Sequence, residues 1–147
     1  MLSFYLQLFG WLVLPAMLVC ALAYGGNSER IGALLIFGGS LASFLVVASP
    51  QARFRSVETP MFVVDALVLI AFVYLALKTK RFWPIWATSF HSIVVLTHLA
   101  DALAPHTIPL AYGILQGVWV YPMTVALLLG VYGHRQAIKR GAASLNS

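Results

Sequence analysis

Apolar stretches of 17 or more residues alternate with short polar connections along the whole chain. At about 1.5 Å per residue, each stretch is close to or above the length of helix that crosses the hydrocarbon core of a bilayer. The pattern predicts a single all-α domain, a polytopic bundle of five transmembrane helices with a basic tail. The predicted helices cover about residues 3–24, 31–48, 61–77, 84–103 and 110–133, and the tail covers 134–147 of the domain at 1–147.

Composition supports a location in the lipid bilayer. The 147 residues are 61% hydrophobic and only 9% charged, which leaves too few charges to solvate the surface of a soluble domain. The net charge of +5 does not indicate nucleic-acid binding, because the bases lie in short connections between apolar stretches. Cys20 is the single cysteine, so an intrachain disulfide and a CxxC motif are excluded.

The distribution of the basic residues predicts how the chain is oriented in the membrane. Five spans place the two termini on opposite sides of the membrane, and seven of the nine Lys and Arg residues fall on the carboxyl-terminal side. Connections rich in Lys and Arg stay in the cytoplasm. We therefore expect a multi-pass inner-membrane protein of bacterial type, with its amino terminus outside and its carboxyl terminus in the cytoplasm. The seven are Arg30, Lys78, Lys80, Arg81, Arg135, Lys139 and Arg140, against Arg53 and Arg55 on the other side.

Ionisable residues inside the fourth apolar stretch are the main functional signal. His91, His98 and Asp101 lie in this stretch, and such groups are costly in hydrocarbon unless they face protein or water. At 100° per residue, His91 and His98 point within about 20° of each other, while Leu96 and Leu103 lie on the opposite side. The fourth helix is therefore predicted to turn a polar face toward the bundle.

Counting residues from the helix ends predicts a polar layer near the outer face of the membrane. Asp65 and His98 fall at one depth, on antiparallel helices that a short connection joins. The functional interpretation is a proton or cation site with His91 as an inner relay. The alternative is that these side chains only hold the helices in register. The candidates are Asp65, His91, His98, Asp101, Gln116 and Tyr121, with Gln7 and Ser43 at a similar depth.

Metal and haem binding are further alternatives. His98 and Asp101 at i, i+3, together with Asp65, offer three possible metal ligands, but the spacing lacks the specificity of a CxxC pair or an HExxH motif. Bis-histidine haem requires ligands that face each other from two helices, whereas His91 and His98 share one helix. No nucleotide-binding glycine loop or nucleophile with a base occurs, so no cofactor is predicted and an enzyme is not favoured.

Small residues indicate close contacts between helices. Glycines four residues from another small residue let two backbones approach, which favours packing within the chain over an interface with a partner. Prolines inside two of the predicted helices predict kinks. The packing glycines are Gly38, Gly39, Gly113 and Gly117, and the prolines are Pro15 and Pro122.

Two classes of function stay open from the sequence. The preferred one is a non-catalytic accessory or assembly subunit that packs against a larger membrane complex or against a second copy, because five helices offer little room for a pathway. The other is a transporter-like or proton-binding or cation-binding protein that uses the intramembrane Asp and His side chains.

Overall fold

The computed structural model describes residues 9–46, 59–103 and 117–145, and the regular structure in these ranges is entirely helical. The all-α prediction is therefore confirmed for this part of the chain. A π-helical turn, η1, leads into the first of five described α-helices. The elements are η1 (Phe9–Val13), α2 (Leu14–Tyr24), α3 (Asn27–Val46), α4 (Thr59–Lys78), α5 (Trp83–Leu103) and α7 (Val120–Leu145).

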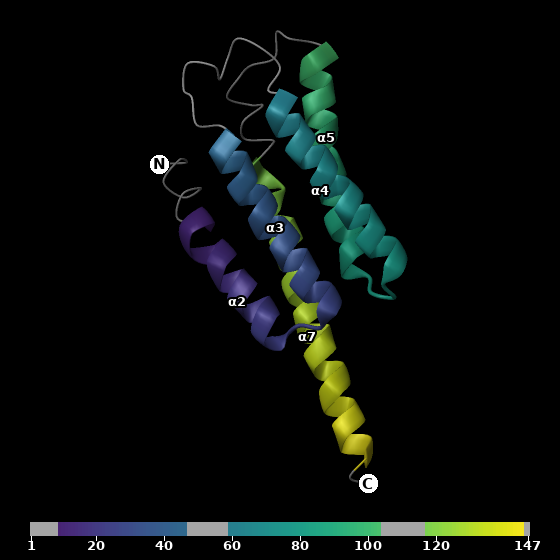
Figure 1. Ribbon diagram of the computed structural model, residues 1–147. Helices are drawn as coiled ribbons and strands as arrows, with labels where there is room; N and C mark the ends of the chain where they lie inside the picture. Colours follow the sequence, from purple (N-terminus) through teal and green to yellow (C-terminus); the bar gives the residue numbers. More distant parts are fainter. Residues whose placement is uncertain (1–8, 47–58, 104–116, 146–147) are drawn as a thin grey trace.

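The helices form one bundle in which sequence neighbours pack side by side (Figure 1). α2, α3, α4 and α5 each contact the next helix of the chain, and α7 contacts α2, α3 and α5. Two short connections meet at one end of the bundle, where α2 and α4 end and α3 and α5 begin. We call this end the basic end, because the seven Lys and Arg residues among the described positions lie there or on the part of α7 that extends past it.

Two helices extend at one end by four residues or more beyond the prediction. α3 begins at Asn27, four residues before the expected start at Ile31, because the Glu29 carboxylate accepts a hydrogen bond from the Gly26 backbone N–H and satisfies a donor of the first turn. α7 runs on to Leu145 and does not end at Gly133. The segment after Gly133 contains Arg, Gln, Ala and Lys, which are strong helix formers, so the predicted tail is largely a helical extension.

Both internal prolines lie where a regular α-helix starts. Pro15 is in the first turn of α2, directly after the π-helical turn that ends at Val13. A proline cannot donate to the carbonyl four residues earlier, and a wider turn accommodates the clash. Pro122 follows a turn at Trp119 and lies in the first turn of α7, where the missing N–H has no intrahelical partner to lose. The predicted fifth helix is thus interrupted at Trp119.

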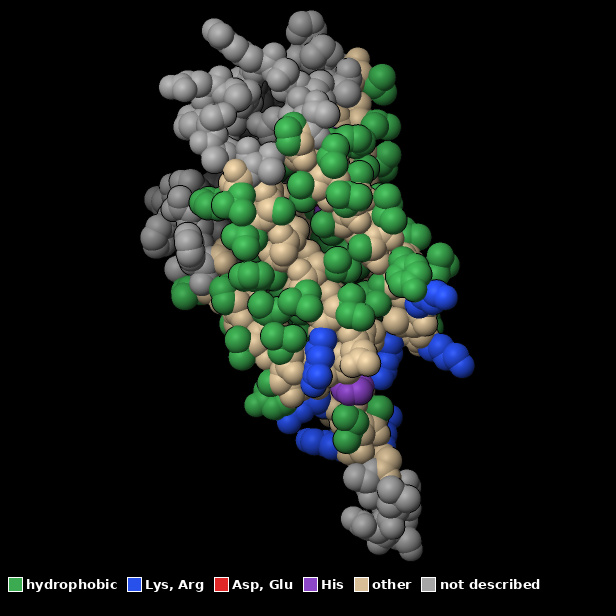
Figure 2. Space-filling model, viewed as in Figure 1, with side chains coloured by type: hydrophobic (Ala, Val, Ile, Leu, Met, Phe, Trp, Pro, Cys, Tyr) green, Lys and Arg blue, Asp and Glu red, His purple; other side chains and the backbone are tan. Residues whose placement is uncertain are grey.

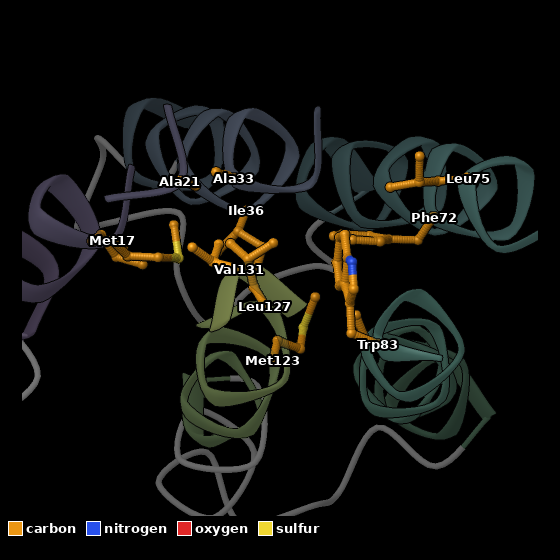
Figure 3. Packing of buried hydrophobic residues seen from close by; sticks show 12 residues of the cluster. Met17, Ala21, Ala33, Ile36, Phe72, Leu75, Trp83, Met123, Leu127 and Val131 are labelled. Carbon is orange, nitrogen blue, oxygen red and sulfur yellow. The ribbon is translucent and has the colours of Figure 1, made fainter. Parts of the chain in front are cut away.

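Trp83, the first residue of α5, is one of the buried residues of the hydrophobic core. Its indole stands beside Phe72 of α4 and close to apolar side chains of α7, including Leu127 (Figure 3). A Cβ atom added at Gly32 of α3 or at Gly130 of α7 would overlap the indole. The two glycines therefore create the space in which Trp83 inserts between α3 and α7.

Much of the apolar surface faces away from this core. Figure 2 shows hydrophobic side chains over the body of the bundle and Lys and Arg side chains gathered at its lower end. Among the described helices, two stretches are long and apolar enough to cross a membrane, Asn27–Leu45 in α3 and Pro60–Lys78 in α4. Only 22% and 17% of these stretches are buried inside the molecule, whereas the core helix of a soluble protein would be mostly buried.

Candidate functional site

The site begins with the two histidines of α5. His91 and His98 are both buried, whereas Leu96 and Leu103 are exposed, so the inward and outward faces of α5 are those that the helical spacing predicts. Thr88 and Ser92 on the same helix donate their hydroxyl hydrogens to the backbone carbonyls of Pro84 and Thr88. The chemistry available on this face is therefore that of imidazole.

Asp65 of α4 meets both histidines. The Nε2 atom of His98 lies 2.8 Å from the Oδ2 atom of Asp65, a short hydrogen bond between two buried side chains. The Nε2 atom of His91 lies 3.0 Å from the Asp65 backbone oxygen and 3.9 Å from its Oδ1 atom. A carbonyl oxygen only accepts, so Nε2 of His91 carries a proton and donates it. One aspartate thus organises two histidines that are seven positions apart.

The surroundings of this cluster are apolar. The ring of Phe62 meets His98 edge-on at 6.0 Å between centroids, and the ring of Phe72 lies 6.2 Å from that of His91. Among the described residues, the histidines are the basic side chains within ion-pair distance of Asp65, and no Lys or Arg is that close. Among these residues, the positive charge that could balance the carboxylate comes from protonation of an imidazole.

For the other predicted site residues the structure gives burial only where their side chains are described. Tyr121 is half-buried on α7, and Ser43 is half-buried on α3. Asp101 belongs to α5, but its side chain, like Gln7 and Gln116, lies outside the described part of the chain. The described cluster therefore consists of Asp65, His91 and His98.

The described residues add no support to the metal hypothesis. Among them, no group of three or more His, Cys, Asp or Glu side chains could hold a metal ion. Asp65 and His98 remain the two adjacent donors of the predicted set, and the Asp101 side chain is not described. Haem binding stays a prediction that the structure does not test.

The packing glycines behave differently from one another. A Cβ atom at Gly39 would lie 3.0 Å from the Val68 side chain of α4, so Gly39 lies at a close helix contact. A Cβ atom at Gly38 would meet nothing within 4 Å, so Gly38 faces away from the described helices. Gly117 is half-buried before α7, and Gly113 lies outside the described residues.

A second polar cluster lies at the basic end, and sequence reasoning missed it. Glu29 is fully buried, and its two oxygens accept hydrogen bonds from the Trp83 indole N–H at 2.9 Å and from the Gly26 backbone N–H at 3.0 Å. Nearby, the Arg81 guanidinium donates to Nδ1 of His134 at 3.0 Å. The available signal was that Glu29 is a lone acid among seven bases on that side.

Comparison with models of known protein families, with curated proteins and with solved structures finds no match for this chain.

Proposed function

We propose that the chain is a five-span protein of a bacterial-type inner membrane, with its amino terminus outside and its carboxyl terminus in the cytoplasm. The support is the outward-facing apolar surface, which includes Leu67, Ile70 and Leu77 on α4, and which lipid would cover. The grouping of the bases at one end supports the orientation, because positively charged ends stay in the cytoplasm.

Reporter fusions test this orientation. An alkaline phosphatase fused after Gln51 is expected to be active, because that connection would lie outside, and a fusion after Lys80 is expected to be inactive. A cytoplasmic reporter such as green fluorescent protein, fused at the same two positions, should give the opposite pattern. Activity of the phosphatase after Lys80 alone would reverse the orientation, and activity at both positions would contradict a span over α4.

Within this membrane protein, we propose that the pair of Asp65 and His98 binds and releases one proton, in a transporter-like role. The observation that carries this proposal is the 2.8 Å contact between the buried side chains of Asp65 and His98. With a proton on the imidazole, the Asp65 carboxylate faces a positive charge at 2.8 Å and the pair is neutral overall, whereas without that proton the pair carries a net negative charge in a low-dielectric site. Proton uptake is therefore the step that balances charge at this position.

His91 has a separate part in this proposal. Its Nε2–H bond to the Asp65 backbone oxygen fixes one tautomer and holds the ring beside the carboxylate whatever the charge of the Asp65 side chain. His91 lies two turns from His98 on the same face of α5. It would thus serve as the next proton carrier toward the basic end.

Proton binding by the purified protein tests the proposed function. In detergent, the parent is expected to take up one more proton than Asp65→Asn between about pH 8 and pH 5, where imidazoles titrate. His106→Gln is the matched control, because it removes a histidine that lies between the predicted helices 84–103 and 110–133. This variant should lose the proton of that imidazole and leave proton binding by Asp65 and His98 unchanged. Histidine nitrogen chemical shifts, measured by NMR, identify which ring takes the proton.

The accessory-subunit hypothesis is the second candidate, and Gly38 favours it. This glycine leaves the surface of α3 open to a close neighbour, next to the exposed side chains of Leu34, Leu41 and Leu45. The proton measurement separates the candidates. If Asp65→Asn binds as many protons as the parent and loses only folded yield, the cluster is a packing device and the accessory role is the better proposal.

A further inference from the structure

The basic end carries a positive charge that the described acidic side chains do not balance. Seven Lys and Arg residues lie there or on the extension of α7, and Glu29 is the acid described at this end. Both oxygens of Glu29 already accept hydrogen bonds from Trp83 and Gly26. The ion pairs of the described residues involve Asp65 alone, so none of the seven bases has a carboxylate within 4.0 Å in this part of the chain.

Arg81 differs from the other bases because the fold holds it in place. It lies in the connection between α4 and α5, is half-buried, and donates to Nδ1 of His134 on α7. The ring of His134 is also positioned by Gly26, since a Cβ atom there would come within 2.9 Å of its Cε1 atom. Little side-chain entropy remains to be lost when these two groups bind a ligand.

The hydrogen bond between Arg81 and His134 also determines which N–H donors these two side chains can offer a ligand. Because Nδ1 of His134 accepts from Arg81, the neutral ring carries its proton on Nε2. A guanidinium has five N–H donors, and one of its nitrogens is engaged here. Arg81 and His134 therefore combine a fixed positive charge with several N–H donors, which suits a phosphate oxygen.

The position of the pair indicates where the phosphate comes from. Exposed tyrosines lie at the same end: the Arg135 guanidinium is 4.2 Å from the centre of the Tyr24 ring, and Tyr132 is exposed on α7 two residues before His134. Trp and Tyr concentrate at the level of lipid headgroups. We propose that Arg81 and His134 bind the phosphate group of an anionic phospholipid in the cytoplasmic leaflet, an inference that rests on the proposed membrane orientation.

Lipid retention in native mass spectrometry tests the site in the full-length protein purified in detergent. Phosphatidylglycerol is expected to bind the parent at least about tenfold more tightly than phosphatidylcholine, and Arg81→Gln should lose about tenfold in affinity for phosphatidylglycerol. His134→Gln should weaken binding several-fold although it removes no Lys or Arg charge. Arg140→Gln, an equal loss of charge on the exposed extension of α7, should cost about twofold or less.

Each alternative result overturns the proposal in its own way. An Arg140→Gln loss as large as that of Arg81→Gln would mean diffuse attraction to the whole basic end. Equal retention of phosphatidylcholine would show that the phosphate charge is not recognised, and displacement of the lipid by millimolar inorganic phosphate would identify a soluble anion as the ligand. Because the measurement uses neither Asp65 nor the fusion reporters, its failure is distinguishable from failure of the proposed proton site or orientation.

Discussion

Gly130→Ala is expected to lower the free energy of unfolding by about 1 to 3 kcal/mol, the usual cost of overpacking a core. The added methyl group would overlap the Trp83 indole. The indole cannot move aside freely, because its N–H donates to the buried Glu29 carboxylate and its other edge lies against Gly32 of α3. Thermal or detergent-induced unfolding of the purified protein, followed by tryptophan fluorescence, measures the effect.

Gly133→Ala is the matched control for this experiment. Gly133 lies three residues further along α7, and a Cβ atom there would meet nothing within 4 Å. Replacing a glycine within a helix by alanine removes backbone freedom from the unfolded chain, so this variant should be unchanged or more stable by up to about 1 kcal/mol. Equal stability of the two variants would show that α3, α5 and α7 do not enclose Trp83 as described.

The same Trp83 contact explains why the Glu29 cluster at the basic end could not be derived from the sequence. Helical periodicity relates residues within one helix, and it placed His91 and His98 on a common face because they are seven positions apart. Trp83 and Glu29 are 54 positions apart, and no spacing rule connects them. Gly32 and Gly130 matter only because an indole from a third helix fills the space beside them.

The position of Asp65 could be predicted from the sequence only in part. Its depth could be predicted because α4 and α5 are antiparallel and joined by a short connection, so equal distances from that connection bring residues to one level. Its rotation toward α5 could not, since α4 is apolar on all sides and offers no pattern to orient it. The contact with His98 confirms the shared depth and adds the direction that the sequence lacks.

The start of α3 also depends on a contact between residues far apart in the sequence. The early start of α3 follows from the Glu29 side chain, which bonds locally to Gly26 and distantly to Trp83. An acid near a helix start is favourable in general, but this rule does not place the start at Asn27. The extension of α7 past Gly133 was missed because glycine and bases together resemble a helix end, although the residues that follow are good helix formers.

The last expected result separates the stability of the Asp65 and His98 pair from its proposed chemistry. Asp65→Leu and His98→Leu, made singly, should each lower the free energy of unfolding by about 3 kcal/mol, because each leaves a buried polar partner without its counterpart. The double variant removes both groups and should regain much of that loss. A coupling free energy of about 1 to 3 kcal/mol is therefore expected between the two positions.

His91→Leu provides the comparison for this cycle, because its described hydrogen bond is to the Asp65 backbone oxygen, which Asp65→Leu leaves in place. Its coupling to Asp65→Leu should be smaller than that of His98→Leu, since the nearest approach of His91 to the carboxylate is 3.9 Å. If the double variant of Asp65 and His98 folds as well as the parent but no longer takes up the additional proton, the pair is retained for proton binding. If the losses simply add, the 2.8 Å contact contributes no interaction of its own, and the charge-balance argument for a proton site fails with it.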